Sequence, residues 1–207
     1  MTSRVRDQRG FTVAELVVTA AVIAFIMAGL FSLLLSGQQS YLTGSGRAEA
    51  QQNSRLVLNR MIQEIRTAGF DPLNTQSFAA VTALSSGTGF VIQNDWNGDG
   101  TISTSGTTTI DNVVHGDQIT YTFTGTTLTR QETGVDANAV TVTTAISNLT
   151  ISYLDADDVA VSTPSGANAA NIRTVVLDIT TLPDNTVSGT VDAAAVRSQN
   201  RVRIRNR

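Results

Sequence analysis

The sequence predicts an α+β fold in which a long N-terminal helix packs on an antiparallel β-sheet. Residues 16–35 form an uncharged, largely apolar run, and the pattern stays helical to about Ala68. From about Thr88 the apolar residues change from a period of about 3.6 to a period of about 2, which is typical of strands. The 207 residues are enough for one such domain with its own core in addition to the helix.

The apolar run is long enough to cross a membrane. At ~1.5 Å per helical residue, residues 16–35 span about 30 Å, the thickness of one bilayer core. A secretory signal has a shorter apolar region with a small-residue cleavage site after it, whereas here Gly10 stands before the run. The run therefore indicates a membrane helix.

One acidic residue, Glu15, lies at the edge of this run, where a charge is costly and requires a reason. A lone carboxylate that snorkels to the membrane interface is one interpretation. The other comes from the segment that contains it, which reads Arg-Gly-Phe-Thr-Val-Ala-Glu at residues 9–15.

This segment, in front of a long apolar helix, resembles the prepilin leader of type IV pilins and pseudopilins. The resemblance implies a pilin-like fold, cleavage between Gly10 and Phe11 by a prepilin peptidase, and N-methylation of the new terminal Phe11. It also implies that the subunit leaves the inner-membrane lipid for a helical filament of major and minor pilins. There Glu15 would meet the terminal amine of a neighbouring subunit, which agrees with the rule that a buried carboxylate needs a partner.

The resemblance divides the chain into four parts. Residues 1–10 are the expected leader, 11–36 the transmembrane and filament-core helix, 37–69 its amphipathic continuation, and 70–207 an exported antiparallel β-rich domain. Arg4, Arg6 and Arg9 precede the apolar run and residues 36–46 carry no charge, so the positive-inside rule places the N-terminus in the cytoplasm. We therefore expect a single-pass inner-membrane protein whose exported domain lies in the periplasm and then in the pilus at the cell surface.

The amphipathic helix is predicted from Leu58, Met61, Ile62 and Ile65, which recur at three- and four-residue spacing. Arg60 and Glu64 are available between them as an i,i+4 pair. Gly69, followed by an Asp-Pro pair, predicts the end of the helix near Ala68.

The strands are predicted from alternating apolar and Thr residues. Ile119, Tyr121 and Phe123 alternate with threonines, and the two-residue turn Gly125-Thr126 before Leu128 predicts a hairpin. Further alternation marks three more segments: Val140 and Val142; Leu149, Ile151 and Tyr153; Val175, Leu177 and Ile179. Each predicted strand has one apolar face, which the apolar stripe of the helix can cover.

The C-terminal residues 201–207 alternate apolar and basic side chains. This pattern predicts a last strand that buries Val202 and Ile204 and whose arginines protect an edge from wrong pairing. Contact with DNA or another anionic surface is the alternative, since clustered arginines can neutralise phosphates. The net charge of −3 argues against a strongly basic nucleic-acid binder, so nucleic acid is an unlikely partner.

Residues 55–70, which close with Arg-Thr-Ala-Gly-Phe, resemble the end of the first helix in minor pilins of the PilW type, and those proteins often end in a similar Val-x-Ile/Leu-Arg-Asn segment. The resemblance implies a structural subunit that helps to prime or cap pilus assembly. Two alternatives stay open: a pseudopilin of a type II secretion system, and a membrane-tethered module for adhesion or DNA binding.

The sequence offers little for catalysis, and we expect no enzyme. His115 is the only histidine and there is no cysteine, so a His cluster, a Cys nucleophile and a disulfide framework are excluded. No phosphate-binding glycine loop follows a predicted strand.

One loop has the pattern of a cation site. Asp95, Asn97, Asp99 and Thr101 place oxygens at alternate positions, as in the first two-thirds of an EF-hand loop, so calcium is the one cofactor to consider. Gly106 stands where the closing bidentate carboxylate would be, and a polar Asx-type turn is the alternative. Asp111 or Asp117 could complete the shell only if the intervening loop folds back.

Overall fold

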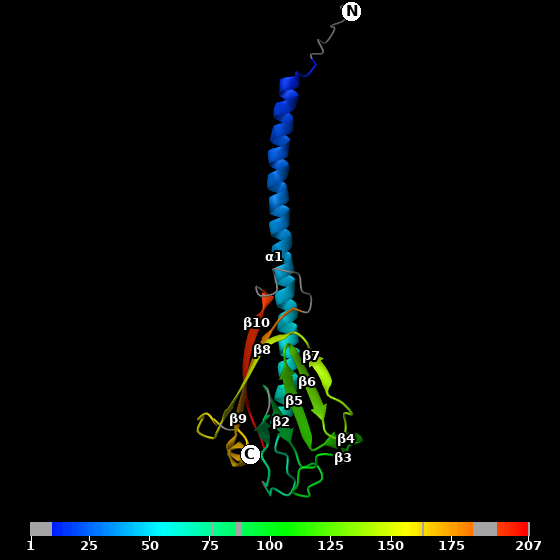
Figure 1. Cartoon of the computed structure of the whole chain (residues 1–207), viewed down its shortest axis with the longest axis vertical. Coiled ribbons are helices and arrows are strands. Elements are labelled where there is room, and N and C mark those ends of the chain that lie inside the picture. Colours follow the sequence, from blue (N-terminus) through cyan, green and yellow to red (C-terminus); the bar gives the residue numbers. More distant parts are fainter. Residues whose placement is uncertain (1–9, 76, 86–87, 163, 184–193, 207) are drawn as a thin grey trace, which may run out of the picture. The chain divides into compact units, whose positions relative to one another are not determined.

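The computed structural model describes residues 10–75, 77–85, 88–162, 164–183 and 194–206. It divides into two compact units, Met1–Leu42 (the N-terminal unit) and Thr43–Arg207 (the β-rich unit). One helix, α1 (Val13–Thr67), contributes to both units (Figure 1). The predicted cleavage residues Gly10 and Phe11 precede this helix. Of the expected leader, residues 1–10, the first nine lie outside the described residues.

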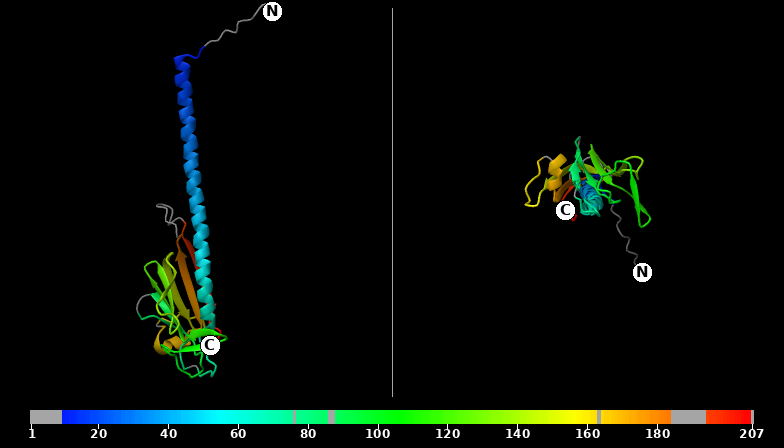
Figure 2. Two further views of the ribbon diagram at one scale, coloured as in Figure 1. Left: turned by 90° about the vertical axis from the view of Figure 1, so that its right-hand side faces the viewer. Right: turned by 90° about the horizontal axis from the view of Figure 1, so that it is seen from below.

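The part of α1 in the β-rich unit is amphipathic, as predicted. Val57, Leu58, Met61, Ile62 and Ile65 are buried on one face, at the three- and four-residue spacing that brings helical side chains onto one side. Figure 2 shows the strands gathered along this part of the helix.

The helix stops where the sequence predicted. Gly69 has a φ of 76°, the left-handed conformation that glycine adopts without strain. Its N–H then donates to the carbonyl of Gln93 at 2.8 Å, which leads the chain from the helix into the sheet. The side chain of Asn206 donates to the carbonyl of Thr67 at 2.9 Å, so a residue of the C-terminus satisfies one of the orphan carbonyls of the helix.

A five-stranded antiparallel sheet lies on the helix, in the order β1-β2-β5-β6-β7. Its strands are β1 (Val81–Ala83), β2 (Thr88–Gln93), β5 (Gln118–Thr124), β6 (Thr127–Glu132) and β7 (Val140–Thr143). Thr124 pairs with Thr127, so the two-residue turn at Gly125-Thr126 is confirmed. Ile119 and Tyr121 are buried as predicted, whereas Val140 stays exposed because β7 is an edge strand beyond the core.

A three-stranded antiparallel sheet, in the order β10-β9-β8, covers the rest of the stripe. Its strands are β8 (Ile146–Leu154), β9 (Thr174–Thr181) and β10 (Val196–Arg203), and the short 3-10 helix η1 (Gly166–Asn171) precedes β9. Val175, Leu177 and Ile179 of β9 are buried, as the alternation predicted. The last strand predicted from residues 201–207 is present, but it runs over Val196–Arg203 and ends before Ile204. Val202 and Ile204 are buried, as predicted.

A separate hairpin, β3 (Thr107–Ile110) with β4 (Val113–Gly116), was not predicted. Its strands are four residues long and mostly exposed, so they lack an apolar face that alternation could reveal. The turn residues Asp111 and Asn112 have φ values of 50° and 64°, the positive pair typical of a tight hairpin turn.

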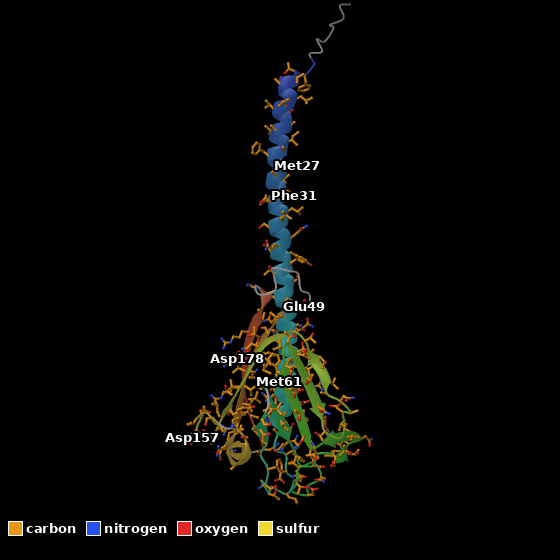
Figure 3. All side chains as sticks on the ribbon, in the orientation of Figure 1. Met27, Phe31, Glu49, Met61, Asp157 and Asp178 are labelled. Atoms are coloured by element: carbon orange, nitrogen blue, oxygen red, sulfur yellow. The ribbon has the colours of Figure 1, made fainter. Side chains whose placement is uncertain are left out.

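The core of the β-rich unit forms where the helical stripe meets the two larger sheets. Met61, labelled in Figure 3, is fully buried among side chains that include Phe90, Tyr121 and Leu177. The rings of Phe90 and Tyr121 stack with their centroids 5.1 Å apart. Burial of these large side chains supplies the main favourable free energy of folding.

We expect Met61→Ala to lower the free energy of unfolding by about 2–5 kcal/mol, because it leaves a cavity between helix and sheets. Leu56→Ala is the matched control: Leu56 lies on the same helix but is 61% exposed, so its loss should cost about 0.5 kcal/mol or less. Denaturant unfolding of the full chain in detergent, followed by the fluorescence of the single Trp96, measures both values. Equal costs for the two variants would contradict this packing.

Candidate functional site

The predicted cleavage position is open to a protease. Gly10 has no atom within 4 Å of the place where a Cβ would stand, and the side chain of Phe11 is 86% exposed. Both residues precede the first turn of α1 and are not part of its hydrogen-bond ladder. A peptidase therefore needs to unwind no helix to reach the bond between them.

The start of the helix carries a reciprocal cap formed by Thr12 and Glu15. The N–H of Glu15 donates to the Thr12 hydroxyl oxygen at 3.2 Å, and the N–H of Thr12 donates to Glu15 Oε2 at 3.0 Å. The Thr12 hydroxyl donates to the same Oε2 at 3.0 Å. This is a capping box, which satisfies two N–H groups that an uncapped helix leaves without a partner.

This cap was not predicted, although the spacing Thr-x-x-Glu before an apolar run is its known sequence signal. Two roles therefore meet at Glu15: it stabilises its own helix start, and it offers a negative charge. An ionised carboxylate has about four acceptor positions, so the Thr12 bonds leave capacity for a cation from another molecule. Its side chain lies at an exposed position.

The apolar surface that follows is exposed around the whole N-terminal unit. Leu16, Phe25 and Leu33 are 64%, 82% and 71% exposed, and Figure 3 shows Met27 and Phe31 projecting from the helix. The helix is long and apolar enough to cross a membrane. Soluble monomers rarely expose contiguous apolar surface of this extent, so lipid or other subunits must cover it.

The hydroxyl of Thr19 does not interrupt this surface, because it donates to the carbonyl of Glu15 at 2.8 Å within its own helix. In a bilayer such internal bonds satisfy a hydroxyl that water cannot reach.

A cluster of buried charges joins the helix to the five-stranded sheet. Arg130 of β6 donates to Glu64 of α1 at 2.9 Å, to Glu132 at 2.7 Å and to Asp136 at 3.2 Å. The hydroxyl of Tyr121 donates to the second oxygen of Glu64 at 2.6 Å. The predicted partner of Glu64 on its own helix, Arg60, is present at 3.6 Å, but the contacts across the sheet are shorter.

Burial and neighbouring charges hold two groups of this cluster, Tyr121 and Arg130, in one protonation state. Burial raises the pKa of Tyr121 far above its usual value, and the negative charge of Glu64 raises it further. Burial lowers the pKa of Arg130, but its hydrogen bond to Glu132 and the charges of Glu64 and Glu132 outweigh that effect, so its pKa is raised. Tyr121 therefore remains a donor and Arg130 a cation, which suits a structural contact.

His115 also has a structural position. Its ring stacks on Trp96 with the centroids 4.6 Å apart, and its Nδ1 lies 3.9 Å from Glu132. The other neighbour of the Trp96 ring is Phe70, just beyond the helix, whose ring lies 5.0 Å away between centroids and is tilted by 32°. These contacts tie the hairpin β3–β4 to the rest of the β-rich unit.

The loop that contains Asp95 is closed by its own hydrogen bonds. Asp95 is fully buried, and its two oxygens accept N–H groups from Gly98 at 2.7 Å, Asp99 at 3.2 Å and Gly100 at 2.8 Å. Asp99 accepts the N–H and hydroxyl of Thr101 at 2.8 and 2.6 Å, and these bonds lower its pKa. This is the arrangement of an Asx-type turn.

The other groups that could bind calcium make hydrogen bonds of their own or lie in another turn. Asn97 donates to Asp99 at 2.8 Å, Asp111 lies in the turn of the β3–β4 hairpin, and Asp117 accepts the N–H of Ser103 at 3.0 Å. Within the described part of the chain no group of three or more His, Cys, Asp or Glu side chains is placed to hold a metal. Calcium binding by Asp95, Asn97, Asp99 and Thr101 stays a prediction.

A calcium site of this kind would be weak, with a Kd of about 10⁻⁴ to 10⁻³ M. At a tenfold excess of calcium over Kd, the free energy of unfolding should rise by about 1.4 kcal/mol. Asp99→Ala should remove this rise, and Asp157→Ala, an exposed aspartate in another loop, should keep it. Thermal unfolding followed by Trp96 fluorescence tests this, and curves that coincide in chelator and in calcium would show that the loop is only a turn.

A comparison with known protein families supports the prediction made from the N-terminal segment. Residues 5–31 match the family described as the prokaryotic N-terminal methylation motif. No curated protein gives a significant match to the chain. The matched segment contains Gly10, Phe11 and Glu15 and most of the exposed apolar run of residues 16–35. The motif is typical of pilin-like structural proteins. The motif and the apolar helix support a type IV pilin-like protein that is held in the inner membrane.

Proposed function

We propose that this chain is a minor pilin of the PilW type, a structural subunit that helps to prime or cap a type IV pilus. The observation that carries the proposal is the methylation motif on an exposed Gly10-Phe11 bond, followed by a capped helix whose apolar surface is open all round. A prepilin peptidase at the cytoplasmic face cuts after Gly10. The new amine of Phe11 is then methylated.

Assembly moves the apolar helix from lipid into a filament core. Lipid and neighbouring pilin helices are both apolar, so the transfer exposes little of this surface to water. In the filament the charge of Glu15 pairs with the Phe11 amine of a neighbouring subunit, which compensates two charges that would otherwise be buried alone. The β-rich residues remain in the periplasm and then on the surface of the pilus.

Two contacts support the PilW assignment over a general pilin-like one. The segments that resemble PilW-type proteins are residues 66–70 and the C-terminal residues 202–206, and the side chain of Asn206 bonds to the carbonyl of Thr67. The nearby Ile204 is buried, and its N–H donates to the backbone carbonyl of Arg173 at 2.9 Å. Asn206 and Thr67, one residue from each of the two segments, are therefore in contact at the end of the helix.

Gly10→Val should leave a full-length precursor in the membrane, because a branched side chain replaces the small residue next to the cut bond. Gly37→Val is the control: this glycine also has open space around it, but it lies far along the helix, so processing should be normal. Immunoblots of membrane fractions separate precursor from mature chain by size. A normally processed Gly10→Val chain would end the prepilin assignment.

Glu15→Gln separates the two roles of this side chain. Glutamine keeps the acceptor that the capping box requires but removes the charge. We expect a stable, processed chain that enters filaments about tenfold less than wild type, which corresponds to about 1.4 kcal/mol. Glu15→Ala should lose the cap as well, whereas Glu49→Gln on the same helix should behave as wild type.

The amount of chain in sheared filaments, divided by the amount in membranes, measures the effect. Equal incorporation of Glu15→Gln and wild type would show that the carboxylate serves only the cap.

A further inference from the structure

The uncharged part of α1 is longer than its apolar run. After Glu15 the next charged residue is Arg47, whereas the apolar run ends at Leu35. The residues just beyond the run, 36–40, are serine, glycine and glutamine, which are small or polar and carry no charge. A charge costs free energy in a membrane, so a segment without charges next to a spanning segment indicates a position in the polar layer of the bilayer.

One large side chain, Tyr41, follows these residues. It is 75% exposed, and within the described part of the chain it makes no side-chain hydrogen bond and no ring contact. At Gly37, one turn earlier on the same face, a Cβ would have no atom within 4 Å. Because helical side chains lean toward the N-terminus of their helix, the ring of Tyr41 has room to reach back toward the apolar run.

The position of Tyr41 along the helix matches the outer polar layer of a bilayer. With residues 16–35 in a hydrocarbon core of about 30 Å, each polar layer adds about 5–7 Å, to give a bilayer of about 40–45 Å. The Cα of Tyr41 lies ~9 Å beyond that of Leu35, and its side chain leans back toward the core. Glu15 stands just before the run at the other end, ~39 Å of helix from Tyr41. Glu15 and Tyr41 therefore bracket the bilayer.

We propose that Tyr41 is the outer interfacial anchor of α1, and that its ring lies among the lipid headgroups at the periplasmic face before assembly. A tyrosine suits this layer because its ring is apolar and its hydroxyl can bond to water or to headgroup oxygens. Lipid is the partner because Tyr41 continues the exposed apolar surface of the same membrane-spanning helix.

The anchor has a consequence for the other end of the helix. A helix held at a fixed depth on one side of the bilayer also has a fixed depth on the other side, where the bond between Gly10 and Phe11 precedes its first turn. Tyr41 therefore acts as a positioning residue that keeps this bond at the level of the peptidase. This consequence rests on the proposed function, whereas the position of the ring in the headgroup layer does not.

Fluorescence quenching in vesicles measures the depth of position 41. Tyr41→Trp, in the full chain, is reconstituted at low density in phosphatidylcholine vesicles whose acyl chains carry bromine either near the glycerol or near the methyl end. The wild-type chain, whose only tryptophan is Trp96, gives the background signal. We expect bromine near the glycerol to quench the added tryptophan more strongly, and the reverse order for Met27→Trp in the middle of the apolar run.

Two results would overturn the anchor. The first is a tryptophan at position 41 that neither brominated lipid quenches, which would place the side chain in water or against another subunit. The second is stronger quenching from the methyl end, which would place position 41 inside the hydrocarbon core.

The rate of cleavage in pulse-labelled cells tests the positioning role. In Tyr41→Ser, conversion of membrane-bound precursor to mature chain should slow about threefold or more, because a misplaced bond reacts more slowly. Tyr41→Trp should restore the rate, since tryptophan is the other aromatic residue enriched at membrane interfaces. Gln38→Ser, an exposed change on the same turn, is the control and should be cut at the wild-type rate.

Cleavage of Tyr41→Ser at the wild-type rate would overturn the positioning role. A slow rate that Tyr41→Trp does not restore would overturn it as well, because the effect would not depend on an interfacial aromatic ring. A wild-type chain that is never cut would instead contradict the proposed function, and the quenching measurement would still decide whether Tyr41 is the anchor.

Discussion

The structure depends on one helix that must satisfy two different environments. Over residues 16–35 its side chains are apolar on every side and exposed, so only lipid or other apolar helices can cover them. Over residues 57–65 the apolar side chains lie on one face, and the chain's own sheets cover that face. The change of pattern within a single helix explains why the chain is suited both to a membrane and to a filament.

The buried charges give the helix a definite position on the sheet. Apolar packing tolerates small shifts, whereas the bonds from Tyr121 and Arg130 to Glu64 require a particular register. Both donors come from the five-stranded sheet. On the other sheet, Thr181 donates to the carbonyl of Ala50 at 2.7 Å, so polar contacts from both sheets fix the same helix.

Periodicity predicted the parts of the fold that have a long apolar face. It identified the helix, its stop at Gly69, the β5–β6 hairpin and the buried residues of β9. It failed for the β3–β4 hairpin, whose strands are short and exposed, and for Val140, because an edge strand can alternate without being buried. The bonds from Tyr121 and Arg130 to Glu64 join residues about 60 positions apart in the sequence, and no local pattern reveals such contacts. The cap at Thr12 was predictable, since its signal is local.

In the proposed function, both features of the N-terminus depend on one covalent event, the cut between Gly10 and Phe11. The capping box leaves Phe11 outside the helix, and we propose that the exposed apolar surface serves assembly only after the cut frees the amine of Phe11. The most direct measurement is therefore the mass of the N-terminal peptide of the wild-type chain from purified filaments or membranes. Our account predicts a peptide that begins with N-methylated Phe11. A peptide that begins at Met1, or at any residue within α1, would contradict it.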